Sequence, residues 1–372
     1  MPRKHTYIIN INGGSKRQEL LYGYGHVKGV SIRLGKQQAT ITYQTGTKRG
    51  VDELISFKDN TFRDAYRKVY LLHAIIMDQG LVVKKIDVNI DGEVTSFDKS
   101  SPSFPFMFSM IGNGKLNLSC KWKDITSEVI STTKTKLEND FRFGAMFSYL
   151  SSRSKQYEVE RFTDLWTSMN SYYSFIAQSY EIALRKELEI DDKVALPKSL
   201  CLQKNDSLSI GALCWILSKK YRKISRKDAD ELWKNNYDTE KILCTYSESQ
   251  IRGLYQAAKN QLVGEPLPEQ YAELVLCAEK FGAPLYTYLL LIYPYHWRCN
   301  LFHGNRTTLL FCAYNDYEIA VIRTVNCFLE MFLNESIPET FQTDFSMKYY
   351  ETVKQYMQEF TGFEKEVEKL KT

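Results

Sequence analysis

Apolar and polar positions alternate in short runs along residues 1–125, a pattern typical of half-buried strands. The alternating runs fall at residues 7–11, 30–34, 39–43, 86–90, 104–108 and 116–122. Gly35-Lys36 separates two of these runs, and Asp91-Gly92 follows another. Asp-Gly between alternating runs is a strong signal for a tight hairpin turn. The pattern therefore predicts an antiparallel sheet.

One helix interrupts the predicted strands, between residues 61 and 80. Its apolar side chains recur at helical spacing: Phe62, Ala65, Val69, Leu72 and Ile76. His73 lies beside this stripe, so we expect it in the core or at its edge. Residues 1–125 are thus predicted to form an antiparallel β-rich module with one packed helix.

After Asp124 the periodicity becomes helical. A long amphipathic helix is predicted at residues 158–188, and a capping box at Asn315-Asp316-Tyr317-Glu318 opens a second apolar helix. Shorter helices are expected near residues 208–222, 226–234, 247–262 and 267–282. A heptad seam runs through the C-terminal helix, residues 345–371, and is weakened at Gly362. The fold class is α+β, with an all-helical bundle at residues 126–372.

Composition limits the choice of function class. A chain of 372 residues has room for two domains, and a net charge of +5 permits nucleic-acid binding without requiring it. The eight cysteines form no C-x-x-C pair, so we expect reduced thiols and no zinc site. The N-terminus lacks the apolar segment of a signal peptide, and the longest apolar run, near residues 288–293, is too short to span a bilayer. We expect a cytoplasmic protein without membrane association, metal ion or cofactor.

Candidate chemistry is concentrated in Tyr295-His296-Trp297-Arg298-Cys299-Asn300-Leu301-Phe302-His303-Gly304. Pro294 and Gly304 bracket this stretch, which predicts a short helix. Histidine can accept and donate a proton near neutral pH, and arginine can bind a phosphate through two hydrogen bonds. Arg298 and His303 are therefore sufficient for cleaving RNA without a metal. Alternatively, Arg298 is a buried structural side chain and His303 caps helix carbonyls.

This segment resembles the Arg-x-x-x-x-His motif of the HEPN superfamily. Asn300-Leu301-Phe302 and Gly304 match the pattern of its abortive-infection branch, and Glu160-Arg161-Phe162-x-x-Leu165-Trp166 resembles the first-helix pattern of that branch. The resemblance covers residues 155–335. In one departure, Cys299 directly follows the arginine where family members often carry asparagine, which leaves the role of Asn300 open.

The resemblance implies a HEPN endoribonuclease in anti-phage defence, with catalytic residues Arg298, His303 and Asn300. It also implies a homodimer with a composite site. Helix geometry also favours a homodimer. Five positions along a helix turn through about 500°, which places Arg298 and His303 about 140° apart. A phage-derived or nucleotide trigger would act on the N-terminal module. The alternative is a non-catalytic HEPN-like module that binds a nucleotide or a protein.

A basic run at residues 219–227 is the candidate RNA-binding surface. Six of its nine residues are basic, and Arg306 follows the motif as a further candidate. The candidate RNA-binding residues are Lys219, Lys220, Arg222, Lys223, Arg226, Lys227 and Arg306. These side chains could contact phosphates and lead RNA toward the motif. A solvated helix end and loop is the alternative interpretation of the same run.

Overall fold

The structure is a computed structural model. The residues that it describes are 2–13, 17–46, 50–104, 114–125, 130, 140–191, 194–203, 209, 212–213, 216, 294, 298, 316–342, 345–360 and 362–371. The chain divides into two compact units, Met1–Phe143 and Gly144–Thr372. The sequence analysis places the domain boundary after residue 125. A sheet followed by helices makes the chain α+β, as the sequence predicts.

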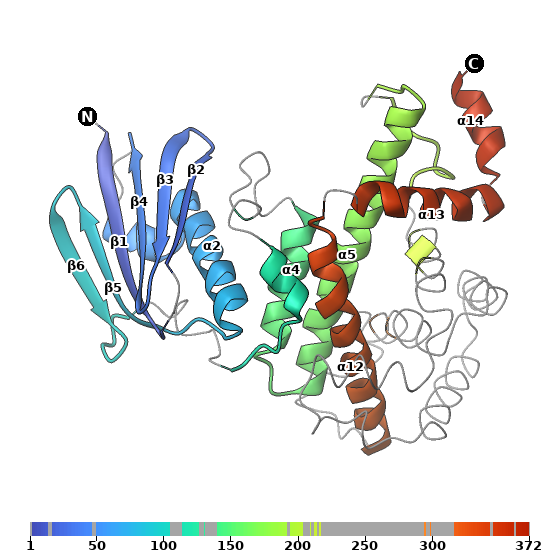
Figure 1. Cartoon of the computed structure of the whole chain (residues 1–372). Helices are drawn as coiled ribbons and strands as arrows, with labels where there is room; N and C mark the ends of the chain where they lie inside the picture. Colours follow the sequence, from blue (N-terminus) through green and yellow to red (C-terminus); the bar gives the residue numbers. More distant parts are fainter. Residues whose placement is uncertain are drawn as a thin grey trace. The chain divides into compact units, whose positions relative to one another are not determined.

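The first unit contains a six-stranded antiparallel sheet (Figure 1). The strands are β1 (Arg3–Ile11), β2 (Gln18–Tyr24), β3 (Val27–Leu34), β4 (Gln38–Thr45), β5 (Val83–Ile90) and β6 (Glu93–Asp98). Their order across the sheet is β2-β3-β4-β1-β5-β6, so β1 is central and β2 and β6 are the edges. The predicted hairpins β3–β4 and β5–β6 are confirmed. β2 has no counterpart among the predicted strands.

Alternation along the strands gives the sheet one apolar face. Tyr7, Ile9 and Ile11 of β1 are buried, as are Val30, Ile32 and Leu34 of β3. Asp91 and Gly92 both have positive φ, 53° and 101°, at the β5–β6 turn. Two central residues with positive φ produce a turn whose twist matches that of the strands, which explains the Asp-Gly signal.

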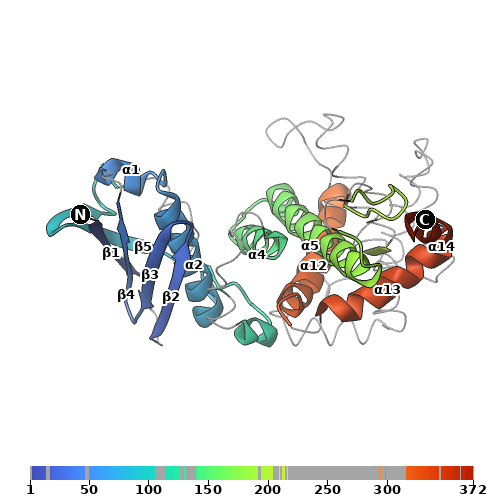
Figure 2. The same ribbon diagram turned by 90° about the horizontal axis from the view of Figure 1, so that it is seen from above.

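Among the described residues of this unit, α1 (Val51–Ile55) and α2 (Asn60–Met77) are α-helices, and α2 lies against one face of the sheet (Figures 1 and 2). Asp59 caps α2, because its Oδ1 accepts a hydrogen bond from the Phe62 amide at 3.0 Å. The predicted helix at 61–80 is confirmed as α2. Between α2 and β2, the Asp64 carboxylate accepts a hydrogen bond from the Tyr22 hydroxyl at 2.9 Å and pairs with Lys68 at 3.4 Å.

The strand predicted at residues 116–122 is wrong. Cys120–Asp124 form a 3-10 helix, η2, and the preceding residues are tied to the end of α2. The amides of Leu116 and Leu118 donate to the backbone and side-chain oxygens of Asp78, at 3.0 and 2.7 Å. Trp122 is fully buried, whereas Cys120 is exposed. A single buried indole, rather than an alternating face, anchors this segment.

The second unit is built on the long helix α5 (Glu158–Glu187), which confirms the helix predicted at 158–188. α12 (Asp316–Glu339) and α13 (Phe345–Phe360) both pack against α5 (Figures 1 and 2). α4 (Phe141–Ser152) contacts it too, since the Ser168 hydroxyl donates to the Ala145 carbonyl at 2.8 Å. Within the described helices, none combines the length and apolar character needed to cross a membrane.

The C-terminal segment predicted as one helix at 345–371 is two helices. α13 ends at Phe360, and α14 (Phe363–Lys371) begins after Gly362. Gly362 has a φ of +63°, a conformation that cannot continue a right-handed helix. Val353, Tyr356, Phe363 and Val367 of the heptad seam are buried within the protein.

His73 is fully buried in α2, as predicted for a core histidine. Burial lowers its pKa to about 4, and the interaction with the Gly80 backbone offsets only part of that shift. The unfolded chain therefore binds a proton on His73 at a higher pH than the folded chain does. Folding stability from this residue is fully present above pH 6.5 and is lost as the pH falls toward 4.

We predict that His73→Gln makes the first unit less sensitive to acid. In the wild type, a shift of this size corresponds to a loss of about 3 kcal/mol in the free energy of unfolding between pH 7 and pH 4. Hydrogen exchange of α2 amides at several pH values measures this loss. His26→Gln, at an exposed position, is the matched control. Equal acid sensitivity in the wild type and His73→Gln would contradict the assignment.

Candidate functional site

Two residues of the motif segment lie within the part of the chain that the structure describes. Pro294 and Arg298 are both helical, and Pro294 is buried whereas Arg298 is partly exposed. Both positions therefore agree with the helix expected there. Asn300 and His303, the other candidate catalytic residues, lie outside the described residues.

The candidate RNA-binding residues also lie outside the described residues. They are Lys219, Lys220, Arg222, Lys223, Arg226, Lys227 and Arg306. The capping residue Asn315 and three of the four predicted shorter helices lie outside as well. The predicted helix at 208–222 is described at Ser209, Ala212, Leu213 and Ile216, all of which are helical.

The strongest concentration of charge in the described helices is a buried ion cluster of Arg153, Arg161 and Glu330. Arg161 is in the first turns of α5, Glu330 is in α12, and Arg153 follows α4. Arg153 Nη1 lies 2.5 Å from Glu330 Oε2, and Arg161 Nε donates to Glu330 Oε1 at 2.5 Å. Arg161 Nη2 also pairs with Glu330 Oε1. One carboxylate therefore links three segments that are far apart in sequence.

The cluster is almost completely shielded from water. The side chain of Glu330 is 0% exposed and that of Arg153 is 4% exposed. Burial opposes ionisation of Glu330, but the charges of Arg153 and Arg161 outweigh it, so the pKa of Glu330 lies below its ordinary value. For Arg161, burial acts to lower the pKa and Glu330 acts to raise it, with a net rise. All three groups are thus charged at neutral pH.

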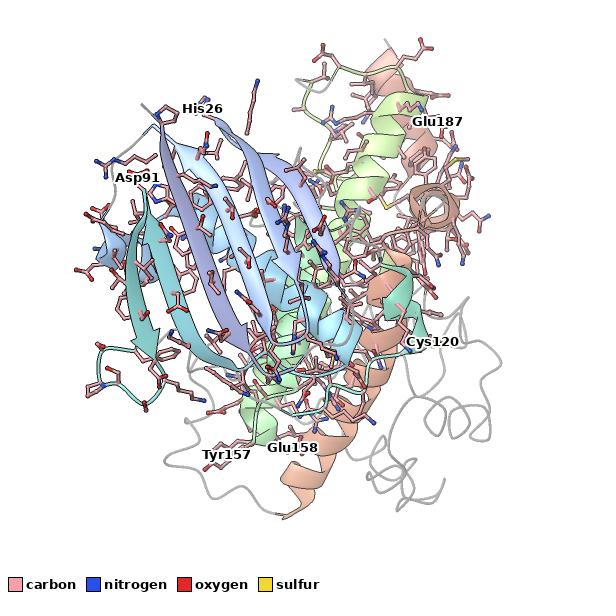
Figure 3. The ribbon with its side chains drawn as sticks, turned by 60° about the vertical axis from the view of Figure 1, so that its left-hand side comes forward. His26, Asp91, Cys120, Tyr157, Glu158 and Glu187 are labelled. Carbon is pink, nitrogen blue, oxygen red and sulfur yellow. The ribbon has the colours of Figure 1, made fainter. Side chains whose placement is uncertain are left out.

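Glu158 and Asn326 extend the cluster. Asn326 Nδ2 donates to both the backbone carbonyl and Oε2 of Glu158, each at 2.8 Å, and Glu158 Oε2 lies 3.6 Å from Arg161. Figure 3 labels Glu158 at the start of α5. Two arginines face two glutamates, so the extended cluster has no net charge. Its chemistry is that of a helix-to-helix clamp, and it offers no surplus cation for a phosphate.

Arg161 is part of the sequence pattern that resembles the first HEPN helix, but that pattern does not identify its ion-pair partner. Glu330 and Arg153 were missed. One signal was available: Asn326, Glu330 and Asn334 recur every four residues in α12, and all three are fully buried. A polar row at helical spacing inside an otherwise apolar helix marks buried polar contacts.

Two further carboxylates on α5 hold neighbouring segments. Glu181 is buried and accepts hydrogen bonds from the Gln203 amide at 2.7 Å and from the Cys201 thiol at 3.3 Å. Glu187, labelled in Figure 3, pairs with Lys354 of α13 at 2.6 Å and accepts a hydrogen bond from the Tyr350 hydroxyl. Polar contacts along its whole length thus make α5 the spine of the second unit.

Aromatic side chains fill the space between these polar contacts. Tyr172 of α5 meets Phe332 of α12 edge to face, with ring centroids 5.3 Å apart. Trp166, Tyr173 and Tyr180 of α5 are also buried. They belong to the core and are not available for stacking on bases.

Among the residues that the structure describes, no group of three or more His, Cys, Asp or Glu side chains is placed to bind a metal ion. Comparison of the chain with protein-family models, with curated proteins and with solved structures found no match. The HEPN resemblance therefore depends on the sequence motifs alone.

We predict that Glu330→Gln strongly destabilises the second unit. A neutral amide leaves two buried guanidinium groups without a counter-charge, and breaking a buried ion pair in this way costs about 3–5 kcal/mol. Urea unfolding, monitored by the hydrogen exchange of α5 and α12 amides, measures the change in the free energy of unfolding. Glu351→Gln, at an exposed position of α13, is the matched control and is expected within about 0.5 kcal/mol of the wild type. Similar stability in both variants would show that the cluster does not hold the helices.

Proposed function

We propose that this chain is a metal-independent endoribonuclease of the HEPN type that acts in anti-phage defence in the cytoplasm. The observation that carries the proposal is the spacing of Arg298 and His303 together with Asn300-Leu301-Phe302 and Gly304. The long helices α5 and α12, at the positions where the resemblance expects long helices, are consistent with it.

The proposed reaction is an internal transesterification of RNA. A 2′-hydroxyl loses its proton and attacks the adjacent phosphorus, and the bond from phosphorus to the 5′-oxygen breaks as that oxygen gains a proton. His303 serves as the base for the first proton transfer or as the acid for the second. Arg298 binds the phosphate and stabilises the extra negative charge of the transition state. Asn300 orients the imidazole or the substrate.

The proposed active species is a homodimer. Arg298 and His303 point about 140° apart on a regular helix, so one helix does not present both to the same phosphate. A two-fold axis beside the motif helices would gather two arginines and two histidines in one cleft. The basic run at residues 219–227 would lead the RNA toward this cleft.

The N-terminal unit is proposed to sense the trigger, a phage-derived molecule or a nucleotide. The sheet and α2 form a compact unit with its own buried core, as expected of a separate regulatory module. Among the described residues of that core, Asp64 and Lys68 form a buried ion pair at 3.4 Å.

We predict that Arg298→Ala and His303→Ala each abolish RNA cleavage while changing the melting temperature little. Both residues are assigned to chemistry, so their loss removes charge stabilisation or proton transfer without opening the core. Cleavage of a labelled RNA and thermal unfolding are measured on the same preparations. The exposed residues Arg17 and His26 provide matched controls, Arg17→Ala and His26→Ala.

Two results would contradict this assignment. One is a variant that loses several degrees of stability and still cleaves RNA, which would mark a structural residue and favour the non-catalytic alternative. The other is loss of wild-type cleavage in excess chelator with recovery on adding Mg²⁺ or Mn²⁺, because the proposed acid–base reaction uses no metal.

Mixing the two inactive variants tests the composite site. If one arginine and one histidine act from opposite chains, mixed dimers of Arg298→Ala and His303→Ala regain part of the activity that each variant lacks. Activity is measured after co-expression or subunit exchange. Cleavage by a wild-type species that sediments as a monomer would rule out the composite site.

A further inference from the structure

We propose that the face of the sheet opposite α2 is a self-association surface that binds the same face of a second copy of this chain. We name this face the open sheet face and define it by two rows of residues that cross all six strands. The first row is Leu21, Ser31, Thr42, Thr6, Asn89 and Val94. The second row is Glu19, Arg33, Thr40, Ile8, Asp87 and Ser96.

Strand register shows that these residues share one face. Each neighbouring pair within a row is directly opposite across two paired strands. On β1, β3 and β4 the residues that flank the row positions are buried in the core, whereas on β6 only Phe97 is buried. Figure 3 shows the sheet from this side, with α2 behind the strands. All twelve side chains are exposed or half-buried.

The two exposed large apolar side chains of the described sheet are at its opposite edges. Leu21 of β2 is 75% exposed and Val94 of β6 is 61% exposed, and both belong to the first row. Exposed leucine and valine on edge strands are unfavourable in water unless another surface covers them. Because four polar residues separate them within the row, they do not form one apolar patch for a lipid surface.

Two opposite charges of the second row lie on different halves of the face, and a second acidic residue, Glu19, lies on the half of the arginine. Arg33 of β3 lies on one side of the central β4–β1 pair, and Asp87 of β5 lies on the other. In the second row two acidic residues accompany one arginine, and each acidic residue has a basic partner within its own chain. A second copy of the face, rotated by 180°, would place its Asp87 opposite Arg33 and its Arg33 opposite Asp87.

A second copy provides such a partner. Consider a two-fold axis parallel to the strands and centred between β4 and β1. Rotation about this axis brings β2 opposite β6, β3 opposite β5 and β4 opposite β1, and each row faces its own counterpart. Leu21 then meets Val94 of the second copy, Arg33 meets Asp87, and Thr42 meets Thr6. The face is therefore complementary to itself in an isologous arrangement.

The area of the face approaches that of a stable dimer interface. Six strands about 4.8 Å apart and about six residues long, at about 3.4 Å per residue, cover roughly 600 Å² on each copy. Stable interfaces bury about 800 Å² on each partner, and side chains that interdigitate bury more than the flat area. Packed sheets cross at about 30°, a rotation that long side chains such as Arg33 can follow.

Existing ion pairs favour this contact. Arg33 Nε lies 3.2 Å from Glu19, and Lys85 Nζ lies 2.9 Å from Asp87. In the dimer, Arg33 would bridge Glu19 of its own chain and Asp87 of the other. The contact would therefore extend two networks that are already formed, and no charge would be buried alone.

The test is sedimentation velocity of the full chain over a range of concentrations. Thr42→Arg places a charged side chain at the axis, and Leu21→Glu places one at the edge, so each should raise the dissociation constant at least tenfold. Arg33→Asp should weaken association similarly, and adding Asp87→Arg should restore part of it by reversing the two Arg33–Asp87 pairs between the chains. Glu53→Arg, at an exposed site in α1, is the control and should leave it unchanged.

Melting temperatures show whether each variant is folded, and the charge-reversal pair keeps the test valid if Thr42→Arg unfolds. A wild type that stays monomeric at tens of micromolar would overturn the proposal. So would unchanged association in Thr42→Arg and Leu21→Glu, as expected if only the motif helices associate, or failure of Asp87→Arg to rescue Arg33→Asp. The readout is mass, so it is independent of RNA cleavage by this chain.

Discussion

A single carboxylate, Glu330, holds two arginines inside the helical unit, and the packing of that unit depends on it. The ion cluster ties the start of α5, the end of α4 and the middle of α12 together, with Glu330 fully buried and the Arg161 side chain 15% exposed. Apolar packing holds α12 against α5, but leucine and phenylalanine contacts are less directional than hydrogen bonds. Two guanidinium groups on one carboxylate fix the register of the helices through defined hydrogen bonds.

This constraint bears on the proposed chemistry. α12 begins at Asp316, thirteen positions after His303 in the sequence, and Arg161 is part of the pattern that resembles the first helix of the HEPN family. The arginines of the HEPN-like pattern therefore have two different roles, one structural and one proposed to be catalytic. Arg161 is a structural residue that fixes α12, whereas Arg298 and His303 are proposed to contact RNA.

Sequence pattern predicted the elements whose signal is local. The β3–β4 and β5–β6 hairpins, α2 and α5 each have a period and a cap or turn residue that act within a few positions. β2 was missed because the exposed Leu21 and Gly23 obscure its alternation. The strand at 116–122 was wrong because Asp78, about 40 residues away in sequence, accepts hydrogen bonds from its backbone amides. The pairing of Arg161 and Arg153 with Glu330 was missed for the same reason, since a buried ion cluster is defined by partners about 170 residues apart.

The candidate site also has features that the local sequence encodes and features that depend on distant partners. Residue types and spacing are local, so the sequence could nominate Arg298, Asn300 and His303 and the reaction they suit. Helical conformation at Pro294 and Arg298 agrees with the predicted motif helix. How two motif helices would meet depends on a second chain, which no local pattern encodes.

The chemical ends of cleaved RNA test the central claim most directly. Attack by the 2′-hydroxyl, with Arg298 and His303 as the reacting side chains, leaves a 2′,3′-cyclic phosphate on one fragment and a 5′-hydroxyl on the other. Mass spectrometry of a short defined RNA after incubation with the full chain distinguishes these ends. The account predicts cyclic phosphate ends that are absent with His303→Ala. Fragments with a 5′-phosphate and a free 3′-hydroxyl would contradict it, because they require attack by water.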